Sequence, residues 1–172
     1  MLSTVLDETG GFRRRERLTA VLQRVAAVAV PARRGATGRG APLREVTVVL
    51  VSDATIAARN LAYRGVAGPT DVLAYPLNEP DDAGVPRSPH LGDVVISLDT
   101  AARQARSRGR PTWHEVAVLA SHGLLHLLGL DHQAPEDWAP FEALQGLAEA
   151  EAEAVDRAGV ARRSLRMARL VT

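Results

Sequence analysis

The chain has 172 residues, of which 46% are hydrophobic and 24% charged, and its formal net charge at pH 7 is +1. These values are typical of one folded domain and argue against a disordered or fibrous chain. The absence of cysteine excludes disulfides, thiolate metal ligands and a cysteine nucleophile. All 21 basic residues are arginine, which excludes lysine-based catalysis. With only two residues each of Trp, Tyr and Phe, we do not expect a stacking platform for nucleobases.

Hydrophobic periodicity and turn residues predict a series of strands and helices in chain order. We expect strands at residues 2–6, 45–51, 71–75 and 92–98. We expect helices at residues 14–30, 54–62, 100–108, 112–128 and 135–156, with N-caps from Ser52-Asp53 and Asp99. The Arg- and Gly-rich residues 33–42 and the Pro-rich residues 77–90 are predicted loops. Because strands and helices mix without strict alternation, the predicted fold class is α+β, with helices packed on one sheet.

We predict a single domain over residues 1–158 and a basic tail over residues 159–172, which we expect to be frayed or disordered. The N-terminus lacks the apolar run of a signal peptide, and the longest apolar stretches are too short to span a bilayer. We therefore expect a cytoplasmic protein without membrane contact. Residues 13–44 contain nine arginines and one acid, whereas residues 136–156 contain seven acids and no arginine. This asymmetry fits either a polyanion-binding face or solvated helix faces.

Three histidines near the C-terminal end of a predicted helix form the pattern H-x3-H-x5-H: His122, His126 and His132. The first two lie one helical turn apart on one face, where both imidazoles can reach one metal ion. Gly129 favours a turn after the helix, which could bring His132 back towards the pair. Three neutral nitrogens would leave a fourth position open, as in a catalytic zinc site. Histidine ligands also suit nickel, copper or iron.

The spacing of these histidines matches that of the zinc protease motif H-E-x-x-H-x-x-G-x-x-H, but Gly123 replaces its glutamate. That glutamate is the general base of peptide hydrolysis, so its absence argues against a protease. Metal-assisted phosphodiester hydrolysis remains a candidate reaction.

Three sequence blocks resemble the bacterial YbeY family. The segment SHGLLHLLGLDH at residues 121–132 is similar to that family's H-G-x-L-H-L-x-G-Y-D-H signature. Residues 60–65 and 69–73 resemble its L-N-x-x-Y-R-G and P-T-[DN]-V-L blocks, and residues 91–93 resemble its L-G-D block. The resemblance covers about Val46–Leu147. The chain departs from the family pattern at several positions. Leu130 replaces the usual Tyr, and Ala74-Tyr75 replaces Ser-Phe. In the last predicted helix, Phe141 and Gln145 stand where Met and Glu are common.

The resemblance implies a metal-dependent, single-strand-specific endoribonuclease that acts in 3′ end maturation of the small-subunit ribosomal RNA and in ribosome quality control. It implies zinc on His122, His126 and His132, with Arg64 as the functional arginine. Implied partners are the small ribosomal subunit, one of its proteins and the Era GTPase. The implied fold has a mixed four-stranded sheet flanked by helices, with the metal at the end of a central helix.

The remaining candidate residues carry open alternatives. Asp131 either orients a histidine ligand without itself binding the metal, or stabilises the turn. We expect Asp71 to be structural, His114 to lie on the surface, and His90 to lack an evident partner. The sequence does not decide whether a water or the RNA 2′-hydroxyl is the nucleophile. A non-catalytic zinc-containing ribosome-assembly factor and a zinc peptidase are the rival functions.

Overall fold

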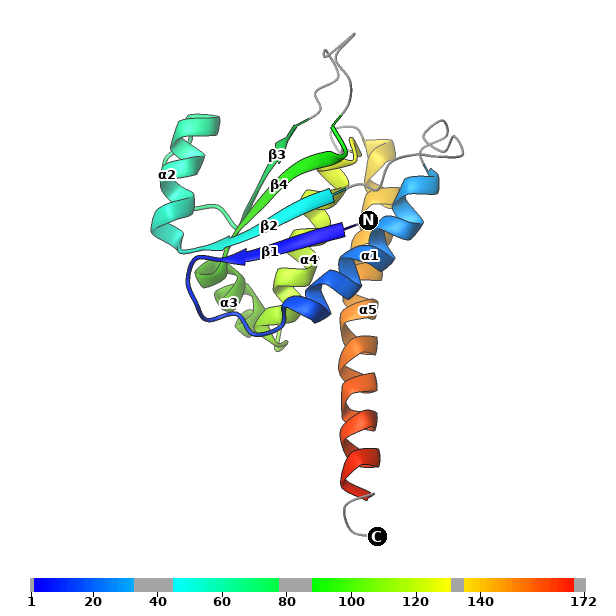
Figure 1. Cartoon of the computed structure of the whole chain (residues 1–172). Helices are drawn as coiled ribbons and strands as arrows, with labels where there is room; N and C mark the ends of the chain where they lie inside the picture. Colours follow the sequence, from blue (N-terminus) through cyan, green and yellow to red (C-terminus); the bar gives the residue numbers. More distant parts are fainter. Residues whose placement is uncertain (1, 33–44, 78–87, 131–134, 169–172) are drawn as a thin grey trace.

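The computed structural model describes residues 2–32, 45–77, 88–130 and 135–168. Four strands lie within these ranges: β1 (Leu2–Asp7), β2 (Glu45–Val51), β3 (Val72–Pro76) and β4 (His90–Ser97). Five helices accompany them (Figure 1): α1 (Arg15–Ala32), α2 (Asp53–Arg64), α3 (Leu98–Ser107), α4 (Thr112–Leu127) and α5 (Pro135–Ala168). The predicted loop at residues 33–42 and most of the loop at residues 77–90 lie outside the described ranges. Within the described ranges, no helix combines the length and apolar character that crossing a membrane requires.

The sheet is mixed, with strand order β1-β2-β4-β3. Strands β1, β2 and β4 run parallel, and β3 pairs antiparallel with β4. The predicted α+β class with one mixed four-stranded sheet is therefore confirmed. The central strand β2 has the bounds predicted from its β-branched run, because a strand buried on both faces is apolar at nearly every position.

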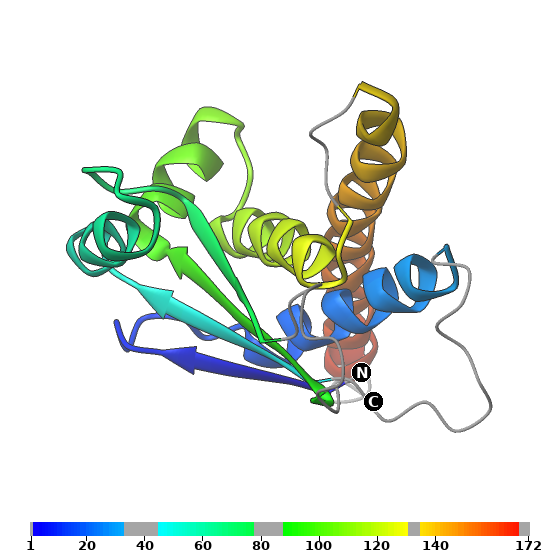
Figure 2. The ribbon, with the colours of Figure 1, turned by 90° about the horizontal axis from the view of Figure 1, so that it is seen from above.

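Alternate residues of the central strands enter two separate cores. Val48 of β2 and Val94 of β4 belong to the larger core with α1, α4 and α5. Their neighbours Val49 and Val95 belong to a smaller core on the opposite face, which Ile56 of α2 completes. Figure 2 shows α1, α4 and α5 on one side of the sheet. Helix α4 is the central helix, since thirteen of its residues are buried between the sheet and its neighbouring helices.

Most helix boundaries differ from the sequence prediction by one or two residues, and two of the differences have a clear physical reason. The N-cap of α3 is Ser97, whose side chain accepts a hydrogen bond from the Thr100 amide at 3.1 Å, and Asp99 lies inside the first turn instead. Helix α5 continues through Gly159 to Ala168, beyond the predicted end near Asp156. One glycine costs a helix only about 1 kcal/mol, so Gly159 does not end it. Figure 1 shows the last turns of α5 extending beyond the rest of the domain.

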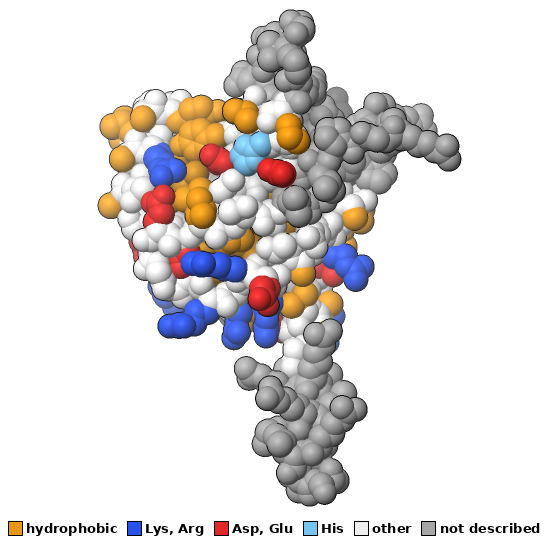
Figure 3. Space-filling view, in the orientation of Figure 1, with side chains coloured by type: hydrophobic (Ala, Val, Ile, Leu, Met, Phe, Trp, Pro, Cys, Tyr) orange, Lys and Arg blue, Asp and Glu red, His pale blue; other side chains and the backbone are white. Residues whose placement is uncertain are grey.

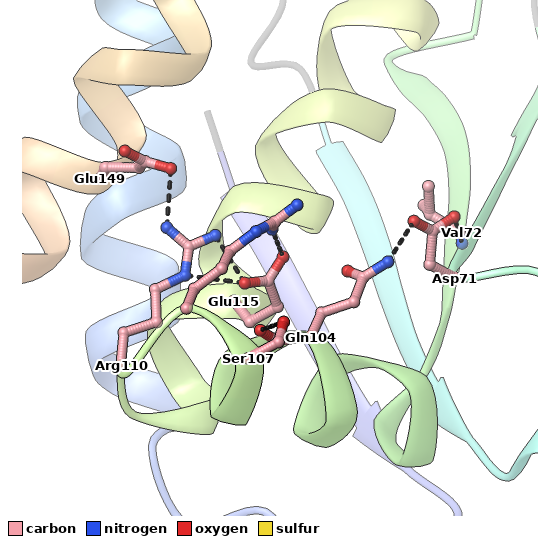
Figure 4. Close-up of polar contacts among 8 residues, drawn as sticks. Asp71, Val72, Gln104, Ser107, Arg110, Glu115 and Glu149 are labelled. Carbon is pink, nitrogen blue, oxygen red and sulfur yellow. Dashed lines mark hydrogen bonds and ion pairs between the residues drawn. The ribbon is translucent and has the colours of Figure 1, made fainter.

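Ionic contacts around the buried Glu115, and between His114 and Asp156, connect α4 to α5. The fully buried carboxylate of Glu115 binds the guanidinium groups of Arg108 and Arg110, and Arg110 Nη1 also lies 2.6 Å from Glu149 on α5 (Figure 4). His114 is buried rather than on the surface as predicted, because its Nε2 atom lies 2.8 Å from Asp156 Oδ2 on α5. These contacts hold the helix that carries the histidine pair.

Candidate active site

His122 and His126 occupy the last two turns of α4, on the face that meets α5 and β3. Their Nε2 atoms lie 3.2 Å apart, and both side chains are half-buried. Phe141 of α5 packs against both imidazoles, with ring centroids 4.9 Å from His122 and 5.2 Å from His126. The helix ends at Leu127 with Leu128 as its C-cap, and Gly129 adopts the left-handed conformation that the sequence predicted.

Arg64 comes to the same site from a different element. It is the last residue of α2, and Gly65 ends this helix in the left-handed conformation with φ 70°. The Gly65 amide donates to the Leu61 carbonyl at 3.0 Å, and the buried Asn60 side chain donates to the Gly68 carbonyl at 3.0 Å. These contacts fix the end of α2, so Arg64 is held at a defined place while its side chain stays exposed.

One cavity of about 640 Å³ brings three of the predicted site residues together: Arg64, His122 and His126 all line it. Tyr63, Gly123, Leu127 and residues of β3 complete the lining. Figure 1 shows why this happens, since the C-terminal ends of α2 and α4 lie at the same end of the domain. Among the described residues that line the cavity there is no aspartate or glutamate, so they supply no carboxylate base.

Gly123, which replaces the protease glutamate, packs against the sheet. A β-carbon at Gly123 would lie 2.5 Å from Val94 Cγ1 and 2.9 Å from Val94 Cγ2. These distances are far inside van der Waals contact, so this position has no room for a side chain unless α4 or β4 moves. The geometry therefore agrees with the sequence argument against peptide hydrolysis by a glutamate at this place.

The histidine pair fits a tetrahedral metal ion. Two nitrogens that bind one zinc ion at 2.0–2.1 Å lie about 3.3 Å apart, close to the observed separation of the Nε2 atoms. The two rings also open onto a solvent-accessible cavity, which leaves space for further ligands. Within the described ranges no cluster of three or more metal-ligating side chains occurs. His132 and Asp131 lie outside these ranges, so the third ligand stays a prediction.

Other residues that the sequence analysis singled out lie elsewhere. Asp71 accepts hydrogen bonds from its neighbour Val72 and from Gln104 of α3, which ties the start of β3 to α3 (Figure 4). His90 pairs with Asp93 on β4, with 3.1 Å between Nε2 and Oδ1, although no partner was evident from the sequence. The sequence analysis did not assign a role to Tyr63, whose only signal was its place beside Arg64 in the Y-R-G block.

The arginine-rich start of α1 lies away from the histidine pair. Arg13, Arg14, Arg15 and Arg17 line a separate cavity of about 570 Å³. Figure 3 shows arginine side chains gathered along the lower edge of the domain, where Figure 1 places α3 and the start of α1. This edge is at the opposite end of the domain from the C-terminal ends of α2 and α4.

The fold and the cavity define an α+β protein with a histidine-lined site at the end of its central helix. A family model described as "Endoribonuclease YbeY" matches residues 11–151 of the chain. The chain therefore belongs to the YbeY family. This result confirms the resemblance inferred from the three sequence blocks.

Several relatives carry the same description. An "Endoribonuclease YbeY" of Deinococcus radiodurans is 57% identical over 97 residues, which are 56% of this chain and 61% of the relative. One of Thermus thermophilus is 53% identical over 100 residues, which are 58% of this chain and 70% of the relative. The match thus spans about three fifths to seven tenths of these relatives. A solution structure from Thermotoga maritima matches with a TM-score of 0.57 at 25% identity and covers 92% of this chain and 93% of that one.

Proposed function

We propose that the protein is a metal-dependent endoribonuclease that cleaves single-stranded RNA. The observation that carries the proposal is the shared cavity, in which an exposed arginine lies with two histidines whose Nε2 atoms fit one metal ion. Relatives named Endoribonuclease YbeY, which match more than half of the chain, support this reaction class. An open cavity that contains a cationic arginine is also suited to a phosphodiester substrate.

In the proposed mechanism, His122, His126 and His132 would hold one zinc ion. When bound, zinc would polarise a phosphoryl oxygen and lower the pKa of a water molecule to about 7. The guanidinium of Arg64 binds the scissile phosphate and offsets the charge that develops on it, because its planar fork matches two phosphate oxygens. Asp131 orients a histidine ligand through the imidazole nitrogen that does not bind the metal.

The attacking group is either a water or the 2′-hydroxyl of the RNA. The two reactions leave different ends, because attack by the 2′-hydroxyl leaves a cyclic phosphate. Mass spectrometry of the cleaved ends separates them. The described part of the cavity lining offers no carboxylate to take the proton, which is consistent with either nucleophile.

We further propose a cytoplasmic role in 3′ end maturation of the small-subunit ribosomal RNA and in ribosome quality control. The proposed partners are the small ribosomal subunit, one of its proteins and the Era GTPase. We place additional RNA backbone contacts on the arginine-rich residues 13–44, of which Arg13, Arg14, Arg15 and Arg17 line the second cavity. Removal of these side chains should flatten the salt dependence of RNA binding.

The decisive experiment measures cleavage of a single-stranded RNA by purified protein, with and without a chelator, next to Arg64→Ala. Removal of one donor that stabilises developing charge typically lowers kcat about 10²- to 10³-fold, so we expect a loss of this size. Arg59→Ala is the matched control, since Arg59 lies on the same helix but pairs with Glu8 at 3.4 Å and does not line the cavity. The same loss in both variants, or chelator-resistant cleavage, would refute the assignment.

Two further measurements, function of the variants in cells and cleavage of an unstructured protein, test the rival functions. A non-catalytic, zinc-containing assembly factor predicts that Arg64→Ala leaves function in cells intact, whereas histidine variants destabilise the protein. A zinc peptidase predicts cleavage of an unstructured protein but not of RNA. The close contact of Gly123 with Val94 weighs against the peptidase.

A further inference from the structure

An exposed tyrosine borders the candidate active site. Tyr63 precedes Arg64 on the last turn of α2 and is 52% exposed, although its ring is one of the largest apolar groups of the protein. It lines the same cavity as Arg64, His122 and His126. A large apolar ring exposed at the edge of a cavity that also contains polar side chains is typical of a ligand contact.

A second tyrosine supports this ring. Tyr75 of β3 lies with its ring centroid 4.5 Å from that of Tyr63, at an interplanar angle of 50°. Tyr75 itself packs against the smaller core, and burial raises the pKa of its hydroxyl. The two rings therefore form a tilted pair in which one tyrosine is anchored in the protein and the other remains half exposed.

The backbone at Tyr63 is also fixed, because Gly65 ends α2 and the Asn60 side chain bonds the Gly68 carbonyl. A tyrosine has only two side-chain torsions, so a ring held in this way loses little conformational entropy when a ligand covers it. Next to it lie the cationic Arg64 and an apolar wall formed by Val72, Ala74 and Pro76 of β3.

We propose that Tyr63 is the stacking surface for one nucleobase of the RNA, next to the phosphate bound by Arg64. This inference rests on the proposed endoribonuclease function and adds a residue that selects the substrate. Every nucleobase has a π-face, so the contact would tolerate any sequence. A base in a duplex is already stacked and paired, so only an unpaired base can occupy this surface. Tyr63 thereby favours single-stranded RNA, even though the protein has few aromatic residues.

The test compares the binding of two labelled oligomers to the zinc-loaded full chain by fluorescence anisotropy. One is a short single-stranded RNA, and the other is an abasic ribose-phosphate oligomer of the same length. Stacking of a base on an aromatic ring corresponds to roughly a 5- to 150-fold change in the dissociation constant. We expect Tyr63→Leu to weaken RNA binding within this range and to leave binding of the abasic oligomer unchanged. Tyr63→Phe should restore RNA binding, because it keeps the ring.

Two controls separate stacking from other effects. Leu61→Ala removes an apolar side chain that is 55% exposed on the same helix but does not line the cavity, so RNA binding should change less than twofold. Arg64→Ala should weaken binding of both oligomers, because both carry the phosphates. Thermal unfolding of each variant shows whether the fold is retained.

The inference is wrong if Tyr63→Leu binds RNA as the parent protein does, or if it weakens binding of both oligomers equally. This result would differ from a failure of the proposed endoribonuclease function, which would appear as absent RNA cleavage or as cleavage that resists the chelator. A parent protein that binds RNA without cleaving it still permits the comparison of Tyr63 variants. A parent protein that binds neither oligomer overturns both proposals.

Discussion

Gly123 of α4 lies directly against Val94 of β4, and this contact determines how closely the histidine-bearing helix approaches the sheet. The two histidines flank Gly123 in sequence, at one residue before it and three residues after it. Close packing at this glycine therefore places both imidazoles beside β3 and the end of α2.

Gly123→Ala should lower the free energy of unfolding by about 1–3 kcal/mol, because an added methyl group in a packed interface forces neighbours apart. Urea denaturation measures the change. Gly146→Ala on α5 is the matched control, since no atom lies within 4 Å of a β-carbon there. This exposed helical position should gain up to about 1 kcal/mol. Equal gains in the free energy of unfolding of both variants would show that Val94 leaves enough space for a β-carbon at Gly123.

His126→Ala should abolish stoichiometric zinc binding, because it removes one of the two nitrogens that share the candidate site. The zinc content of the purified protein and titration calorimetry measure the effect. His132→Ala should behave in the same way if His132 is the third ligand. His90→Ala is the control, because His90 pairs with Asp93 on β4 and does not line the cavity. Unchanged zinc binding in His126→Ala would refute the site.

Glu115→Gln should destabilise the fold by about 1–3 kcal/mol, since it removes the buried charge that Arg108 and Arg110 bind, while Arg110 keeps Glu149 and Arg108 remains half exposed. Arg157→Ala provides the comparison, because it breaks an exposed pair with Glu153 at 3.2 Å and should cost less than about 1 kcal/mol. Denaturation curves measure the free energy of unfolding of both variants. Similar losses of stability in Glu115→Gln and Arg157→Ala would contradict the proposed importance of the buried Glu115 cluster.

Asp53 should make the stability of the fold depend on acidic pH. The hydrogen bond from Arg103, assisted by those from Ser97 and Thr100, lowers the pKa of Asp53 from 3.8 to about 2. A carboxyl whose pKa is lower in the folded state stabilises the fold above its unfolded pKa, and this contribution disappears as the pH falls to about 2. The free energy of unfolding should therefore fall between about pH 4 and pH 2.

Asp53→Asn should make this acid-side slope shallower in denaturation curves measured across the same pH range. Some slope should remain, because Asp7 and Asp156 also have lowered pKa values: burial raises them, but hydrogen bonds outweigh that effect. Glu153→Gln at an exposed position controls for the loss of one negative charge. An unchanged slope in Asp53→Asn would contradict the role of this carboxylate.

Local chemistry explains why some features could be predicted from the sequence. The β2 strand follows from its β-branched run, and the His122–His126 pair follows from the helical repeat, because both patterns depend on neighbours along the chain. The N-cap of α3 was predicted two residues too late, since Ser97 and Asp99 are both good caps and the end of β4 selects between them. The burial of His114 was missed, because its partner Asp156 is 42 residues away.

The α+β class, the central strand and the helical histidine pair could all be predicted from local sequence patterns, since each depends on short-range periodicity. Only the tertiary structure brought Arg64 and Tyr63 of α2 to the histidines of α4, which lie about 60 residues further along the chain. The reason is that the order of strands in the sheet places the ends of these two helices at one edge of the domain. Side-chain packing across that edge, at Gly123 against Val94 and Phe141 against both imidazoles, gave the site its shape.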